Sequence, residues 1–389
     1  VPAYFLQSIN IILSSLLSTQ RNFRLPALMD SLARGMITIC CLILFADILQ
    51  VKSIVLAQVL VELVICCTLF YELFSHRVIV FKLSVRVQKK YLQQFVQVAV
   101  PSSWINLMQS IFELFVKASL TALGPGVLAL QQYAVKIIQA FIDLFGHHFS
   151  HVYSVELAQY KDSLESRAER SSLFVRVCVF LGLCCIPVSI FIWFFSYDII
   201  SLFYQRGSIS AENVTTTSHI LKILSISILP ASIFCLFSRI IYNSAESPKF
   251  ALRYFYLSVV SLASVALLSG AFGLLGICLS IVLYSVLGVL FGVWQIGSDY
   301  NGKVLRSTCR EWARSFVCSV LSGGTVYYLS SYFSLDSPSH SSLLQLMHMC
   351  LKGSAFIGGY AVLSLTPMGV LRRRGYFAEE LSRFNYFTS

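Results

Sequence analysis

Two neighbouring apolar segments, residues 95–123 and 127–155, each carry a stripe of polar and ionisable side chains, and only Gly124-Pro125-Gly126 separates them. Residues that recur every three or four positions share one face of a helix. The first stripe consists of Asn106, Ser110, Glu113 and Lys117, and the second of Lys136, Asp143, His147 and His151. A charge inside a membrane segment costs about 2.5 to 3.5 kcal/mol even on a lenient insertion scale. The hairpin is therefore the predicted functional site.

The spacing along this hairpin predicts that Glu113 and Lys136 lie level with each other. At about 1.5 Å per residue, Glu113 is roughly 18 Å and Lys136 roughly 16 Å from the turn at Pro125. Both depths are near the middle of a hydrocarbon core about 30 Å thick. Glu113 is expected to pair with Lys136 or with Lys117, one turn further along its own helix. The surplus cation favours a cavity that binds an anion, above all a phosphate, over a purely structural ion pair.

The second stripe continues with Asp143 and His147, which suit either a proton or ion pathway or the wet cytoplasmic mouth of the cavity. The histidine spacing lacks a matching acidic ligand, so we predict no metal, and no organic cofactor. Arg239, in a later segment, either snorkels to the membrane surface or adds a cation to the same cavity.

Arg34 and Glu62 are two of the charged residues in the apolar segments before the hairpin. Glu62 has no partner visible in the sequence, so it is either protonated or faces another polar stripe. Arg34 lies near the inner end of its segment and is predicted to anchor that segment at the membrane surface.

The composition predicts an all-α fold, a polytopic membrane helix bundle. Of the 389 residues, 57% are hydrophobic and 12% are charged, with a mean hydropathy of +0.75, whereas about 25% of a soluble domain is charged. Because Val1-Pro2 falls directly into an apolar segment, we expect the chain to be truncated within a larger bundle. Eleven segments are long enough to span a bilayer: about 2–20, 28–50, 53–74, 98–123, 127–150, 173–196, 217–243, 251–271, 273–297, 312–333 and 343–366.

The net charge of +11 records membrane topology. Alternate connections and the C-terminal tail hold 20 of the 29 Lys and Arg residues, and the intervening connections hold only Lys52 and Arg206. This asymmetry places the basic connections and the C-terminus in the cytoplasm. It also argues against a nucleic-acid partner. The 12 cysteines lie almost wholly in apolar segments and are predicted to be small buried hydrophobic residues.

Basic connections divide the chain into predicted domains. The remainder of an N-terminal lobe (1–75) and a cytoplasmic connection (76–94) precede a C-terminal lobe of six spans (95–299). A second connection (300–314), a terminal transmembrane hairpin (315–371) and a cytoplasmic tail (372–389) follow.

Several strings resemble the MurJ/MviN lipid II flippases of the multidrug/oligosaccharidyl-lipid/polysaccharide exporter superfamily. ALGPGVLALQQYAVKIIQAFIDLFGHHFS (122–150) is similar to that family's pattern of Gly, Leu, Tyr-Ala-x-Arg and a Leu-Phe-Gly run. The other similar strings are FRLPAL (23–28), IISLFYQRGSIS (199–210) and SRIIYNSAESPKF (238–250). The resemblance follows the family's order over most of the chain.

The resemblance implies a two-lobed exporter with a terminal hairpin, of which this chain has about eleven of the family's fourteen spans. Lys136 stands at the family's cavity arginine after Tyr-Ala, which implies head-group binding, and Arg239 matches an arginine of the family without an assigned role. The chain departs from the pattern in lacking the first three spans, in Lys for Arg at position 136, in Asp30 for a usual Pro and in Arg34 for a usual Asn.

We therefore predict a transporter, not an enzyme. It is a bacterial inner-membrane, multi-pass flippase that moves lipid-linked peptidoglycan precursor by alternating access, with Lys136, Lys117, Glu113 and Arg239 as substrate-binding residues. The expected partners are a polyprenyl-diphosphate-linked oligosaccharide, the phospholipid bilayer and cell-wall synthesis and division proteins. The expected energy source is the membrane potential or an ion gradient. The alternatives are a polysaccharide or multidrug exporter, a membrane-embedded lipid-modifying enzyme and an inactive scaffold.

Overall fold

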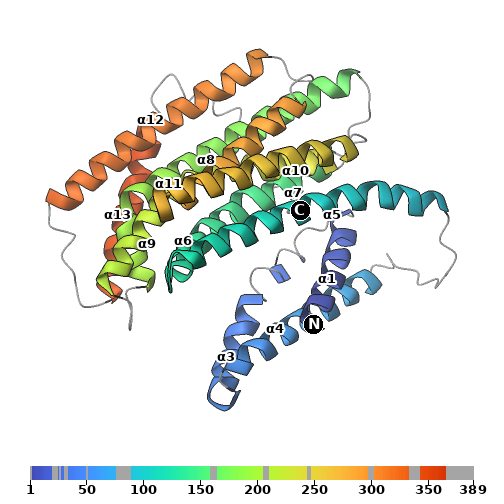
Figure 1. The fold of residues 1–389 in the computed structure, drawn as a ribbon, viewed down its shortest axis with the longest axis horizontal. Coiled ribbons are helices and arrows are strands. Elements are labelled where there is room, and N and C mark those ends of the chain that lie inside the picture. The colour runs from blue at the N-terminus through green and yellow to red at the C-terminus, as the bar shows by residue number, and fades with distance from the viewer. Residues whose placement is uncertain are drawn as a thin grey trace. The chain divides into compact units, whose positions relative to one another are not determined.

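The computed structural model describes residues 2–19, 25, 28–29, 34–49, 51–75, 89–157, 164–204, 210–242, 247–296, 302–332 and 342–364, and every regular element in these ranges is a helix. The chain forms two compact units (Figure 1). Unit 1 comprises Val1–Val87 with Arg373–Ser389, and unit 2 comprises Gln88–Arg372. The predicted all-α fold is therefore confirmed for the described residues.

Unit 2 contains the polar hairpin and most of the helices. In chain order these are α5 (Lys89–Ala122), α6 (Val127–Phe141), the π-helix η2 (Ile142–His147), α7 (His148–Leu157), α8 (Leu164–Tyr204), α9 (Ala211–Ser225), α10 (Ile228–Tyr242), α11 (Ser247–Ile296), α12 (Gly302–Tyr332) and α13 (Ser342–Ser364). α8 packs against α9 and α12, and α11 packs against α5 and α10 (Figure 1).

The long element α11 is folded back on itself at Gly273. The backbone there has φ 55° and ψ −127°, a conformation that a residue without a Cβ adopts most readily. The hydroxyls of Tyr254 and Tyr284, 30 positions apart, are hydrogen-bonded to each other, whereas a straight helix would hold them about 45 Å apart. The two halves therefore lie side by side, as expected from two separate spans at 251–271 and 273–297.

The predicted span 217–243 is formed by two helices, which together are long and apolar enough to count as one broken span. α9 and α10 meet at a bend of 47°. Ser227 uses its hydroxyl to bond the carbonyl of Leu224 at 2.6 Å. Pro230, in the first turn of α10, has no N–H with which to continue the α9 ladder. Local hydrogen bonding and proline together break the helix at Ile226–Ser227.

Helices occupy all eleven predicted segments, but not all of these helices meet the length and hydropathy expected of a single span. Within the described ranges, five helices do so, or six if the bent pair of α9 and α10 counts as one. One of the five, Arg253–Trp294, contains the fold at Gly273.

The terminal hairpin, α12 and α13, packs on α8 within unit 2. The indole of Trp312 donates to the carbonyl of Cys178 at 3.0 Å. It occupies the space that a Cβ at Gly182 would need. Lys352 of α13 is buried and pairs with Asp198 of α8 at 2.8 Å. Hydrogen bonding, an ion pair and several aromatic contacts with α8 thus join this hairpin to the rest of unit 2.

Unit 1 is built on α4 (Val51–Ser75), which packs against α1 (Pro2–Thr19) and α3 (Arg34–Leu49). Apolar side chains at four-residue intervals along α4 form the centre of its core: Val61, Ile65, Leu69 and Leu73, with Leu13 and Leu17 of α1.

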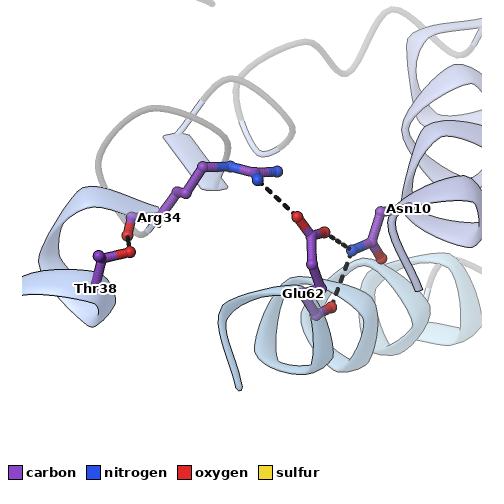
Figure 2. Close-up of polar contacts among 4 residues, drawn as sticks. All are labelled: Asn10, Arg34, Thr38 and Glu62. Carbon is purple, nitrogen blue, oxygen red and sulfur yellow. Dashed lines mark hydrogen bonds and ion pairs between the residues drawn. The ribbon is translucent and has the colours of Figure 1, made fainter. Parts of the chain in front are cut away.

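A polar network joins the three helices of unit 1 (Figure 2). Glu62 of α4 is fully buried, and its carboxylate accepts hydrogen bonds from Arg34 of α3 at 2.6 Å and from Asn10 of α1 at 2.8 Å. The same amide of Asn10 donates to the backbone carbonyl of Glu62 at 2.9 Å. The prediction of Arg34 as an anchor is therefore wrong, because its guanidinium neutralises Glu62. The question that the sequence left open about Glu62 is also answered, since Glu62 faces polar partners on two other helices.

We expect Arg34→Ala to destabilise unit 1 more than Arg34→Ala combined with Glu62→Gln. The single change leaves a buried carboxylate without a cation, which costs about 3 kcal/mol, and the second change removes that carboxylate charge. Thermal unfolding of the purified protein in detergent measures both effects. Lys52→Ala, an exposed cation on the same helix α4, is the matched control and should leave the melting temperature unchanged. A double variant that melts no higher than the single one would contradict this account.

Candidate binding cavity

The turn between α5 and α6 sets the direction of the two polar stripes. Gly124 and Gly126 have φ of 138° and 87°, in the left-handed region that favours glycine. Pro125 between them has no N–H to extend α5. The chain therefore reverses within three residues, and the polar faces of α5 and α6 border one cavity of about 490 Å³.

The walls of this cavity come from four parts of unit 2: α5, the continuous run α6–η2, the broken pair α9–α10 and the second half of α11. Of the residues predicted for substrate binding or ion coupling, the structure brings Glu113, Lys117, Lys136 and His147 to this cavity. Asp143 lies next to His147 without lining the cavity.

The charges in the cavity do not balance. Lys117 pairs with Glu113 at 3.4 Å, and the two side chains are 50% and 68% exposed. Of the two partners considered for Glu113, the structure therefore shows Lys117. Lys136 is exposed, and among the described residues no ion pair or hydrogen bond involves its side chain. An exposed ion pair of this kind is only weakly held. The cavity therefore contains Lys136, which has no ion pair among the described residues, and Lys117, whose pairing with Glu113 is weak.

Asp143 and His147 lie in the π-helix η2, which continues α6. The Asp143 carboxylate accepts from Gln139 at 2.8 Å and lies 3.7 Å from Nε2 of His147. The same Nε2 is 3.7 Å from the thiol of Cys235 on α10. A π-helix is uncommon and is often found at functional sites, because it shifts the side chains that follow it around the helix axis. Here it places His147 opposite α10.

Two predicted side chains lie outside the described residues. The backbones of Arg239 and His151 belong to α10 and α7, but nothing can be said of where their side chains lie. Among the side chains that the structure does describe, no group of three His, Cys, Asp or Glu residues is arranged to hold a metal ion.

Four glutamines in the walls were missed at the level of sequence: Gln109, Gln131, Gln132 and Gln139. The signal was present, because Gln132, Lys136 and Gln139 follow the helical spacing of the recognised stripe. Gln131 is 3% exposed, and its Oε1 accepts a hydrogen bond from Gln132 at 2.9 Å. Charge alone does not single out these amides, because a glutamine carries none.

The wall opposite α6 presents hydroxyl oxygens. Ser227 donates to the carbonyl of Leu224 and Ser285 to that of Ile281, while Tyr284 bonds Tyr254. Because the two serine hydroxyls already donate within their own chain segment, their remaining capacity is to accept. The cavity can thus offer cations, amides and acceptor oxygens to one ligand.

Comparison with known proteins shows which protein family the chain resembles. Residues 1–347 match the family described as "Lipid II flippase MurJ". A protein named probable lipid II flippase MurJ from Rhizobium tropici is 30% identical over 225 residues, which are 56% of this chain and 41% of that protein. Its namesake from Thermotoga maritima is 27% identical over 213 residues, 54% of this chain and 43% of that protein. The chain thus spans less than half the length of these relatives.

Solved structures are similar in fold. A lipid II flippase MurJ in an inward closed conformation superposes with a TM-score of 0.62 at 16% identity, over 93% of this chain and 72% of that one. A MATE protein in the bent conformation gives 0.60 at 15% identity, over 79% of this chain and 68% of that one. At these identities the likeness concerns the helical fold alone. The match over residues 1–347 goes further: the chain belongs to the lipid II flippase MurJ family.

Proposed function

We propose that this protein moves lipid II, a polyprenyl-diphosphate-linked saccharide, across a bacterial inner membrane by alternating access. The observation that carries the proposal is the unneutralised Lys136 in a cavity shared with the Lys117–Glu113 pair. The names of the family and of its relatives in Rhizobium tropici and Thermotoga maritima support the choice of substrate.

The charge arrangement suggests how an anionic head group is held. In the empty cavity Glu113 holds Lys117, and Lys136 remains exposed to solvent. A diphosphate carries enough negative charge to interact with both lysines, so it displaces Glu113 from Lys117. Each ammonium acts as a point charge, without the two-pronged geometry that an arginine offers to phosphate. Glu113 is then the group that recovers Lys117 when the ligand leaves.

The fold is shared with MATE proteins, so a multidrug exporter is the natural competitor. An exporter of organic cations needs a cavity with net negative charge to stabilise its substrate. The described charges here have the opposite balance, because Lys117 and Lys136 outnumber Glu113. The electrostatics therefore favour an anionic substrate.

The rest of the transport cycle follows from the setting in a membrane. Because a diphosphate carries negative charge, the membrane potential favours its movement to the outer face, and an ion gradient is the other energy source. We place the C-terminus in the cytoplasm, following the charge asymmetry of the connections. Arg239 is proposed as a further substrate-binding residue. Wall-synthesis and division proteins are the expected protein partners.

We expect Lys136→Ala in the full-length protein to abolish growth of a strain depleted of its own lipid II flippase, because the head group loses its principal cation. Lys136→Arg should support growth. Lys222→Ala removes a lysine that lies over Trp193, away from the cavity, and is the matched control. Growth and protein level are measured together, and normal growth of Lys136→Ala at normal expression would contradict the role of Lys136.

The charge of the cavity can be tested through Cys235, which lines it. In a protein that keeps Cys235 as its sole cysteine, an anionic thiol reagent should react faster than a cationic one after correction for their rates with a free thiol. We expect a ratio of about three to ten, since two lysines act over a short distance in partly screened surroundings. Lys136→Gln should lower this ratio. A second protein that keeps only Cys185, which is fully buried, serves as the unreactive control. A preference of Cys235 for the cationic reagent would overturn the anion-binding proposal.

A further inference from the structure

The glutamines of α6 differ in the partner to which each amide is bonded. Gln139 donates to Asp143 at 2.8 Å. Gln131 and Gln132 bond each other at 2.9 Å, and the described residues provide no other hydrogen bond to either amide. A carboxamide has two donor hydrogens and two acceptor lone pairs. The single internal bond therefore leaves most of the capacity of this amide pair unused, beside a cavity that both residues line.

Gln131 is 3% exposed, yet neither polar atom of its amide is a fully buried group without a partner. What remains accessible of this amide therefore borders the cavity that it lines. Gln109, on α5, also lines the cavity, and no described residue is bonded to its side chain. Three amides, one on α5 and two on α6, thus border the cavity with unused hydrogen-bond donors and acceptors.

The lysines and the amides suit different parts of one ligand. The lysines suit a negatively charged group, and the amides suit groups that both donate and accept hydrogen bonds. A diphosphate only accepts hydrogen bonds, so a carbonyl oxygen of glutamine gains nothing from it. A sugar hydroxyl both donates and accepts hydrogen bonds, as does an amide substituent. A carboxamide can accept from such a group and donate to it at the same time. The acceptor oxygens of Ser227 and Ser285 on the other wall also suit hydroxyl donors.

The amide pair lies close enough to Lys136 for one ligand to place a diphosphate at the lysine and a sugar at the amides. Gln132 precedes Lys136 by four residues on the helix α6, a spacing that puts the two Cβ atoms about 5–6 Å apart. A diphosphate held by Lys136 therefore brings the group attached to it next to Gln132. On the other side of Lys136, Gln139 donates to the carboxylate of Asp143, whereas Gln132 donates only to the neutral amide of Gln131. Because a hydrogen bond to a charged group is the stronger of the two, a ligand displaces the bond on the Gln131–Gln132 side more readily.

We propose that Gln131 and Gln132, with Gln109 on α5, form a carbohydrate subsite that contacts hydroxyl and amide groups of the sugar attached to a diphosphate at Lys136. This subsite rests on the proposed function, since it requires the diphosphate to occupy the cavity. It selects for a glycosylated ligand, whereas the lysines select only for charge.

The test compares two ligands of equal charge: a polyprenyl diphosphate esterified with a single N-acetylhexosamine, and the same polyprenyl diphosphate esterified with methyl. Both bind to the purified full-length protein in lipid nanodiscs, and their dissociation constants are measured side by side. The unaltered protein should bind the sugar ester about tenfold more tightly, the size expected of two modest hydrogen bonds. Gln132→Met, and Gln131→Met with Gln132→Met, should reduce this ratio to about one without weakening the methyl ester.

Gln139→Met is the matched control, because Gln139 lines the cavity on the same helix but is engaged with Asp143. It should preserve the ratio. Since Gln131 is buried, thermal unfolding of each variant in the absence of ligand checks that the variant is folded. If the double variant does not fold, Gln132→Met alone tests the subsite.

Equal binding of the two ligands to the unaltered protein, or a ratio that survives Gln132→Met, would overturn the subsite. An equal loss of both ligands in a folded variant would overturn it too. In these cases a loss of methyl-ester binding in Lys136→Ala would leave the proposed function standing. Failure of the unaltered protein to bind either ester would overturn both the subsite and the proposed function.

Discussion

A charge placed inside an apolar helix bundle must be neutralised by another charge or kept in contact with water, because an isolated ion in a low-dielectric interior is very costly. This chain meets the constraint in two ways. In unit 1, Glu62 is fully buried and its carboxylate is held by Arg34 and Asn10. In unit 2, Lys136 is exposed to a cavity, and the protein supplies no counter-charge for it among the described residues. The first arrangement is closed and ties helices together, whereas the second is open and needs water or a ligand.

The helical repeat of α6 places different polar groups in order along one face beside the cavity. Residues at positions 132, 136 and 139 lie on one face and present an amide, a cation and a second amide in order. The amide next to Asp143 is engaged, and the cation and the other amide remain available. One helix therefore offers neighbouring sites to a charged group and to a hydroxylated group. The α5 stripe adds Lys117 with its own counter-ion, so the charge that is available depends on whether Glu113 is displaced.

Sequence periodicity predicted features within one helix and failed for contacts between distant helices. Hydropathy located each helical segment, and three- to four-residue spacing placed Glu113 with Lys117. The partners of Glu62 could not be found in this way, because Asn10 and Arg34 are 52 and 28 positions away and their approach depends on how three helices pack. The break at Ile226–Ser227 was missed because serine and proline are compatible with a membrane helix when neighbours satisfy its backbone. The amide pair was missed because charge, and not hydrogen-bonding capacity, was used to choose candidates.

Two of the irregular backbone segments of unit 2 border the same cavity. Ser227, at the break between α9 and α10, lines it, and so do Ile142 and His147, the first and last residues of the π-helix. Irregular backbone is tolerated at membrane depth only where protein or water satisfies its polar groups. These two segments border a cavity, where protein or water can satisfy their N–H and C=O groups. The straight part of α5 that carries Glu113 and Lys117 has no such break. Under the proposed alternating access, we infer that the wall formed by η2 and the α9–α10 junction rearranges around charges that α5 and α6 hold in place.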